Sequence, residues 1–245
     1  SNEAILEAQM LMLQAHNILN PANGAPITVP AQDMVLGLYY ITKLRKGAKG
    51  EGLTFYGPEE ALIAYNEGKV DIHAIINVVV KDLDKDGNIV DVMMKETSVG
   101  RVIVNEIVPA EVGYLNTIIS KKSLRDIISD VIKAVGVARA CEFLDGIKNL
   151  GYHMAFKGGL SFNLGDIIIP KEKEELVKRG NEEVEQIMMN YNMGFITDNE
   201  RYNQVIDTWT HVNSDLSDIL YKTIKNDDQG FNSVFMMLDS GARGS

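Results

Sequence analysis

The sequence predicts an α+β protein, with a mixed core of helices and a short β-hairpin and a protruding antiparallel two-helix coiled-coil arm. Three observations predict this class. A proline-rich segment near the start separates two apolar helical patterns, two Val- and Ile-rich runs follow, and the final third carries apolar residues at helical spacing. With 245 residues and 45% hydrophobic content, the chain can bury one or two cores.

The first elements are two helices around a rigid connection. Residues 3–14 have apolar residues at helical spacing, and Asn2 is the expected cap. Residues 34–41 predict a short buried helix. Between them lies segment 17–32, whose three prolines fix φ and lack an N–H. We expect this segment to be extended and unable to join the centre of a sheet.

The middle of the chain predicts a helix, a β-hairpin and three more helices. Pro58 in a first-turn position starts the helix, which Gly68 ends. Residues 73–80 and 88–95 form the hairpin, because both are rich in Val and Ile and turn residues separate them. Further helices are expected at 102–108, 122–135 and 138–150, with Gly136 and Gly151 ending the last two.

The hairpin turn imitates the beginning of a calcium-binding loop. Asp82, Asp84 and Asp86 stand at the first, third and fifth positions, and Gly87 is the sixth. A working loop needs a bidentate carboxylate at position twelve, where this chain has Met93. We therefore interpret the run as a plain turn. The four histidines are scattered without ligand spacing, so no metal site is expected.

The last third predicts the arm, from two helices over 171–191 and 198–225. Gly194 makes the turn between them, and Thr197 with Glu200 forms a capping box at the start of the second helix. A short loop between two such helices forces them antiparallel. Two rows of apolar residues seven apart predict one seam: Tyr202, Trp209 and Leu216, and Val205, Val212 and Ile219.

Composition limits the classes of function. A net charge of −10 repels phosphate backbones, which argues against general nucleic-acid binding by this chain alone. No apolar run approaches the ~20 residues of a membrane helix, and no targeting leader opens the chain. The single Cys141 permits no internal disulfide, which suits a reducing cytoplasm. We expect a cytoplasmic protein without a membrane partner.

The most informative stretch is NILNPANGAPITVPAQDMVLGLYY, residues 17–40. It closely resembles a sequence block of the β′ subunit family of bacterial DNA-directed RNA polymerase. The resemblance continues in order through later blocks: GPEEA at 57–61, AYNEGKVDIHA at 64–74, TSVGR at 97–101, NEIVP at 105–109, GGLSFNLGD at 158–166, ERYN at 200–203 and FNSVFMMLDSGARGS at 231–245.

The resemblance implies a piece from the middle of β′, the pore and funnel around the secondary channel. Residues 1–160 then form the pore core, 161–230 the funnel with its helical-hairpin rim (171–225), and 231–245 the start of the segment leading back to the active centre. The family's metal-binding aspartate run has no match here. The parent is thus a nucleotidyltransferase that binds Mg²⁺ outside this chain, while the piece holds no catalytic residue or cofactor and should be inactive.

The resemblance also implies partners and contact residues. The parent joins the β, α and ω subunits, nucleotides, DNA and RNA in the cytoplasm, associated with the nucleoid. Arg243 would reach the triphosphate of an entering nucleotide. Asn203 and Asp207 would contact transcript-cleavage and regulatory factors. Gln204 replaces a usually basic residue of the rim site for guanosine tetraphosphate, so we expect weak binding of that alarmone.

The bend between the arm helices offers a further docking surface. A six-residue loop can scarcely bury its apolar residues, which favours a contact site: Tyr191, Met193, Phe195 and Ile196. The alternative, that these side chains pack on one another as a plug, stays open here. From composition and periodicity alone, the chain could also be a free-standing interaction protein whose coiled-coil arm recruits partners.

Overall fold

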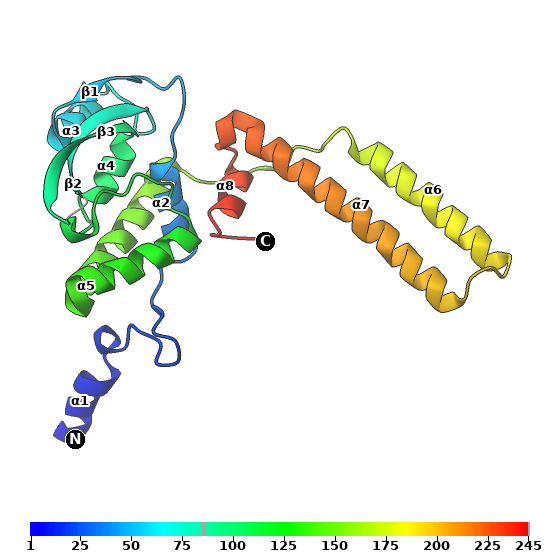
Figure 1. The fold of residues 1–245 in the computed structure, drawn as a ribbon, viewed down its shortest axis with the longest axis horizontal. Helices are drawn as coiled ribbons and strands as arrows, with labels where there is room; N and C mark the ends of the chain where they lie inside the picture. The colour runs from blue at the N-terminus through cyan, green and yellow to red at the C-terminus, as the bar shows by residue number, and fades with distance from the viewer. Residues whose placement is uncertain (85–86, 245) are drawn as a thin grey trace. The chain divides into compact units, whose positions relative to one another are not determined.

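The structure is a computed structural model that describes residues 1–84 and 87–244. The chain divides into two compact units, Ser1–Leu160 with Met236–Ser245, and Ser161–Phe235. Helices dominate both units, and one small mixed sheet lies in the first (Figure 1). The predicted α+β class is therefore confirmed.

The first unit holds the sheet and five α-helices in the order α1 (Asn2–Glu7), α2 (Asp33–Thr42), β1 (Thr54–Phe55), α3 (Pro58–Asn66), β2 (Ile76–Leu83), β3 (Ile89–Thr97), α4 (Val99–Asn105) and α5 (Lys121–Gly158). Short π or 3₁₀ turns lie at η1 (Ala8–Met12), η2 (Gln14–His16) and η3 (Ala110–Val112). The second unit adds η4 (Leu164–Asp166), α6 (Lys173–Asn192), α7 (Asp198–Asn226) and η5 (Asp227–Gly230), and the unit boundary falls within α8 (Ser233–Asp239).

Helix α2 is the centre of the larger core, and it lies against α5 (Figure 1). Seven of its ten residues are buried, so this helix has almost no polar face. The two helices cross where Gly37 meets Gly151. A Cβ atom on Gly37 would lie inside contact distance of the Gly151 carbonyl oxygen. The crossing is therefore possible only because both residues lack a side chain.

The sheet forms a second core with α3 and α4. Strand β2 is central, parallel to β1 and antiparallel to β3. Its alternate residues Ile76, Val78 and Val80 are buried, as the two-residue period of a strand requires. They pack with Ala61 of α3 and Val102 of α4. The predicted hairpin is confirmed; the two-residue strand β1 was not predicted.

The hairpin turn uses its carboxylates to hold the backbone. Asp84 Oδ1 accepts a hydrogen bond from the backbone N–H of Asn88 at 2.8 Å, and Asp82 Oδ1 accepts one from the Tyr114 N–H at 2.9 Å. These contacts agree with a structural turn. Asp86, the third carboxylate of the calcium-like run, lies outside the described residues.

The first predicted helix differs from the structure. Helix α1 ends at Glu7 and continues as the π turn η1, and Ser1 rather than Asn2 caps it, since Ser1 Oγ accepts from the Ala4 N–H at 3.2 Å. None of its residues is buried. The following proline-rich segment folds back in a turn closed by a bridge between Leu19 and Pro26, rather than running extended.

The predicted ends of α4 and α5 also need correction. Ser98 caps α4, so this helix begins three residues before the predicted position 102 and ends at Asn105. Helix α5 is interrupted at Gly136, as expected, but it continues past Gly151 to Gly158. In a sequence, a glycine required for close helix packing has the same appearance as a glycine that ends a helix.

The second unit is built on the antiparallel pair α6 and α7, close to the predicted bounds (Figure 1). Gly180 of α6 is buried where Val212 and Trp209 of α7 approach it. Val212 is 6% exposed, whereas Tyr202 is 59% exposed. The predicted seam is therefore wrong at Tyr202, which points away from the helix contact.

We expect Gly151→Ala to destabilise the first unit by about 2–3 kcal/mol, because the new methyl group meets the backbone of Met34. Urea unfolding followed by circular dichroism measures this loss. The matched control is Gly146→Ala on the same helix, where the methyl group meets the movable side chain of Ile107. Equal losses for the two variants would contradict the explanation.

Candidate functional site

The bend between α6 and α7 (residues 191–197) begins with a Schellman turn. Gly194 has φ +76°, a left-handed conformation that favours glycine. Its N–H donates to the Tyr191 carbonyl at 2.9 Å, and the Phe195 N–H donates to the Asn190 carbonyl at 3.0 Å. These two bonds satisfy the last carbonyl groups of α6 and turn the chain sharply. The predicted turn residue is confirmed.

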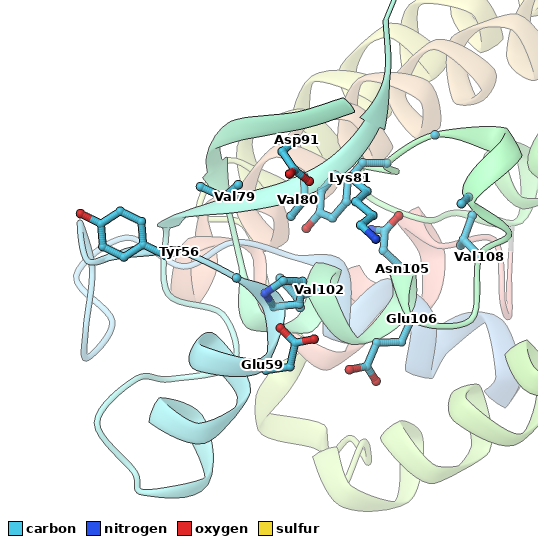
Figure 2. Close-up of a pocket in the computed structure, with 15 residues that line it drawn as sticks. Tyr56, Glu59, Val79, Val80, Lys81, Asp91, Val102, Asn105, Glu106 and Val108 are labelled. Atoms are coloured by element: carbon cyan, nitrogen blue, oxygen red, sulfur yellow. The ribbon is translucent and has the colours of Figure 1, made fainter. Parts of the chain in front are cut away.

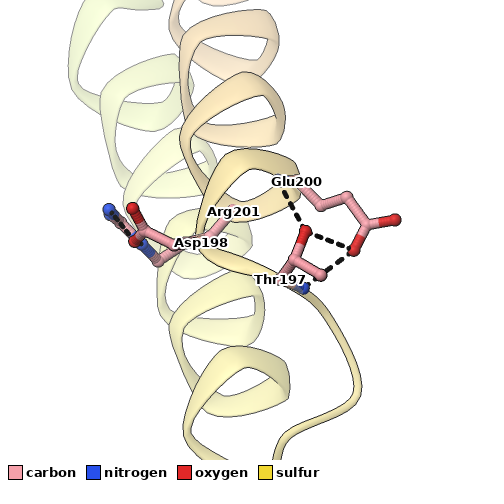
Figure 3. Close-up of polar contacts among 4 residues, drawn as sticks. All are labelled: Thr197, Asp198, Glu200 and Arg201. Carbon is pink, nitrogen blue, oxygen red and sulfur yellow. Dashed lines mark hydrogen bonds and ion pairs between the residues drawn. The ribbon is translucent and has the colours of Figure 1, made fainter.

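A capping box begins α7 (Figure 3). Thr197 Oγ1 accepts from the Glu200 N–H at 3.3 Å, and Glu200 Oε2 accepts from the Thr197 N–H at 2.8 Å. The hydrogen bonds from Thr197 lower the pKa of the Glu200 carboxyl group. Beside the box, Arg201 pairs with Asp198 at 2.8 Å. The bend is thus fixed at both ends by local hydrogen bonds.

The apolar residues of the bend remain open to solvent. Met193 is 66% exposed and Phe195 is 74% exposed, while Tyr191 is 37% exposed and Ile196 is half-buried. The Arg201 guanidinium lies 5.3 Å from the centre of the Tyr191 ring. Met193 and Phe195 therefore do not form a closed plug, and this geometry favours a contact surface.

Asn203, Gln204 and Asp207 are exposed on α7, just beyond the bend. Asn203 and Asp207 are one helical turn apart and lie away from the residues that face α6, such as Thr208 and Val212. Residues 180–212 contain six acidic residues and one basic residue, Arg201. An apolar bend with an acidic surround fits a partner surface that is apolar at its centre and basic at its edge.

Arg243 belongs to the first unit, separate from the bend residues. Its guanidinium pairs with the Asp33 carboxylate at 3.1 Å, and both side chains are more than half exposed. Arg243 therefore has an ion-pair partner within the first unit. An exposed ion pair of this kind contributes little stability and can exchange its anion easily.

A pocket of about 470 Å³ lies between the sheet and α4 (Figure 2). Its lining includes apolar side chains, among them Val80, Val102 and Val108, and charged side chains from several elements, including Glu59 and Glu106. This pocket could not be predicted from sequence patterns, because its lining comes from separated segments. The lining also contains Lys81, Asp91 and Asn105, and this mixture of charges selects no single ligand class.

Within residues 1–84 and 87–244, no group of three or more His, Cys, Asp or Glu side chains is placed to hold a metal ion. His73 is buried, and its Nδ1 lies 3.0 Å from the Lys43 carbonyl oxygen. Burial lowers the pKa of His73, which favours the neutral ring.

Among residues 1–84 and 87–244, no helix has the length and apolar character needed to cross a membrane.

Comparison with known proteins places these features in a family. The family model described as RNA polymerase Rpb1, domain 3, matches residues 17–167, which is more than half of the chain. The model described as RNA polymerase Rpb1, domain 4, matches residues 196–245. The chain belongs to the family of the largest subunit of RNA polymerase.

Several relatives with high sequence identity are bacterial. The chain is 98% identical over 245 residues to the DNA-directed RNA polymerase subunit beta' of Phocaeicola vulgatus, and 86% identical to that of Bacteroides fragilis. It is 55% identical to that of Flavobacterium johnsoniae over 99% of its length. In each case the chain spans 17% of the relative.

The two family models divide the candidate residues. Asn203, Asp207 and Arg243 lie within the match to domain 4, as does Ile196 at its edge. The exposed residues Met193 and Phe195 lie between the two matched ranges. The apolar character of the bend is therefore an observation on this chain itself, independent of the family models.

Thr197→Ala should destabilise the α6–α7 pair by about 1 kcal/mol, because the first turn of α7 loses its side-chain acceptor. Thermal unfolding of the 245-residue chain, followed by circular dichroism, checks this value. Thr210→Ala is the matched control, since the Thr210 hydroxyl donates only to the Ile206 carbonyl within the same helix. A loss as large in the control would contradict the capping role.

Proposed function

We propose that this chain forms the wall and rim of the secondary channel in the β′ subunit of a bacterial DNA-directed RNA polymerase. The observation that carries the proposal is the exposed apolar bend between two paired helices, on a chain 98% identical to part of a β′ subunit. In this proposal the parent enzyme transfers nucleotides, and transfer at Mg²⁺ takes place on segments outside this chain.

The proposed domains follow the family order. Residues 1–160 form the pore, residues 161–230 form the funnel with a coiled-coil rim at 171–225, and residues 231–245 begin the segment that returns to the active centre. The partners are the β, α and ω subunits, with DNA and RNA in the assembled cytoplasmic, nucleoid-associated enzyme. The contribution of this chain is positional: it guides nucleotides and holds factors near the active centre.

The rim docks transcript-cleavage and regulatory factors. Met193 and Phe195 supply exposed apolar area, and Asn203 and Asp207 supply a polar edge on the same end of the helix pair. This combination resembles a protein interface, with an apolar centre and a polar rim. The exposed Gln204 offers hydrogen bonds but no charge, which supports only weak binding of the phosphate-rich alarmone.

Arg243 contacts the triphosphate of the entering nucleotide. Its guanidinium is exposed and pairs with the exposed carboxylate of Asp33. A phosphate group can accept two parallel hydrogen bonds from a guanidinium and carries more charge than the carboxylate. Exchange of Asp33 for phosphate is therefore favourable, and it needs no rearrangement of the buried core.

Asp207→Lys should weaken binding of a transcript-cleavage factor to the assembled polymerase about tenfold, because it replaces a charge that complements a basic partner. Binding isotherms at two salt concentrations measure the change. Asp218→Lys makes the same charge change on an exposed residue about three turns further along α7. Equal weakening by the two variants would contradict local docking at the rim.

Arg243→Ala in the assembled polymerase should raise the nucleotide KM about tenfold, because the triphosphate loses a charge-assisted contact. Steady-state nucleotide incorporation measures KM and kcat. Lys121→Ala, a change of an exposed cation near the same loop, is the control. Unchanged KM and kcat in Arg243→Ala would refute the assignment of Arg243 to the nucleotide.

A further inference from the structure

Three polar side chains form a chain of hydrogen bonds from α2 to the end of α8. Lys43 Nζ donates to the Tyr39 hydroxyl oxygen at 3.3 Å, and the Tyr39 hydroxyl donates to Asp239 Oδ2 at 2.6 Å. Tyr39 and Asp239 are 200 positions apart in the sequence. Sequence patterns did not indicate this contact, because nothing local relates residue 39 to residue 239.

Two of the three side chains are buried, whereas Asp239, at the end of α8, is exposed. Tyr39 is 2% exposed and Lys43 is 7% exposed. A buried ammonium group needs hydrogen-bond acceptors and a compensating anion. Tyr39 connects the Lys43 ammonium to the Asp239 carboxylate, and the ammonium also lies 5.1 Å from the centre of the Tyr39 ring. Removing the hydroxyl group therefore removes this connection between the buried ammonium and the carboxylate.

The residues directly after Asp239 are fixed by hydrogen bonds to Lys121 and to the end of α8. Ser240 is fully buried, and its carbonyl accepts from the Lys121 N–H at 2.9 Å. Its hydroxyl oxygen accepts from the Ala242 N–H at 3.2 Å. The Arg243 N–H donates to the Met237 carbonyl at 3.2 Å. These bonds fix the 240–244 loop against Lys121 and against the last turn of α8, the helix that ends at Asp239.

We propose that Tyr39, Lys43 and Asp239 are positioning residues that hold the 240–244 loop, and thereby set where Arg243 meets the nucleotide. The inference rests on the proposed role of Arg243 and adds the residues through which α2 controls it. Asp33, at the start of α2, pairs with the Arg243 side chain, while Tyr39 anchors Asp239, the last residue of α8 before the loop. The loop is therefore held from two points on one buried helix.

The test uses the assembled polymerase with Tyr39→Phe or Asp239→Asn in β′. Tyr39→Phe removes both hydrogen bonds of the Tyr39 hydroxyl, and Asp239→Asn removes the charge of the acceptor and weakens its bond to Tyr39; each change keeps the shape of the side chain. We expect the nucleotide KM to rise about three- to tenfold, with kcat within about twofold. Amide hydrogen exchange in a peptide covering 237–244 should become about tenfold faster. The KM of the double variant should be no higher than that of the more affected single variant, since both changes disrupt the Tyr39–Asp239 hydrogen bond.

Tyr114→Phe is the matched control. It also removes a phenolic hydroxyl that is partly buried in the first unit and hydrogen-bonded to Thr97 at 2.9 Å, away from the 240–244 loop. The nucleotide KM and the hydrogen exchange of the 237–244 peptide should both match those of the unchanged enzyme. If this control moves KM or loop exchange as far as Tyr39→Phe does, a general loss of stability explains the effect and the positioning role is overturned.

The failure of this inference is distinguishable from failure of the proposed function. If Arg243→Ala raises KM but Tyr39→Phe and Asp239→Asn leave KM and loop exchange unchanged, the positioning role falls and the role of Arg243 stands. If Arg243→Ala leaves KM unchanged, Arg243 does not contact the nucleotide. The proposal that Tyr39, Lys43 and Asp239 position Arg243 for the reaction is then also wrong. If the effects of Tyr39→Phe and Asp239→Asn on KM add up in the double variant, the claim that both residues act through one contact is also overturned.

Discussion

The close crossing of α2 and α5 is the constraint on which the first unit depends. Gly37 and Gly151 allow backbone to meet backbone there. At its other end, α2 meets α4 closely, where Gly100 faces the Ile41 carbonyl. The helix is therefore held on two sides without room for adjustment, because packed interiors leave few voids. Its rigidity lets Tyr39 define the position of a segment distant in the sequence.

The second unit reaches a defined shape by different means. Only a few residues of α6 and α7 are buried, among them Gly180, Thr208 and Val212. Such a pair gains little from a large core, so its end caps and its narrow contact at Gly180 matter more. Because the two helices bury so few residues, the bend residues also remain exposed. A surface suited to a partner follows directly from the small area that the two helices share.

Local patterns in the sequence predicted the local parts of this structure. The hairpin, the buried helix α2 and the capping box at Thr197 depend on residues that are near one another in the chain, and all are observed. The errors have physical reasons. Gly151 serves packing rather than ending a helix, and Tyr202 lies outside the helix contact although its spacing fits a heptad.

The candidate functional residues also include some that the sequence predicts and some that it does not. The exposed bend could be predicted, because a short loop cannot hide Met193 and Phe195. The link from Tyr39 to Asp239 could not be predicted, since only the folded chain brings the two residues together.

The sole tryptophan, Trp209, lies over Gly180 in the second unit. Intrinsic tryptophan fluorescence of this chain therefore originates in the helix pair alone, and its emission wavelength is a built-in optical probe of whether those helices are together or apart.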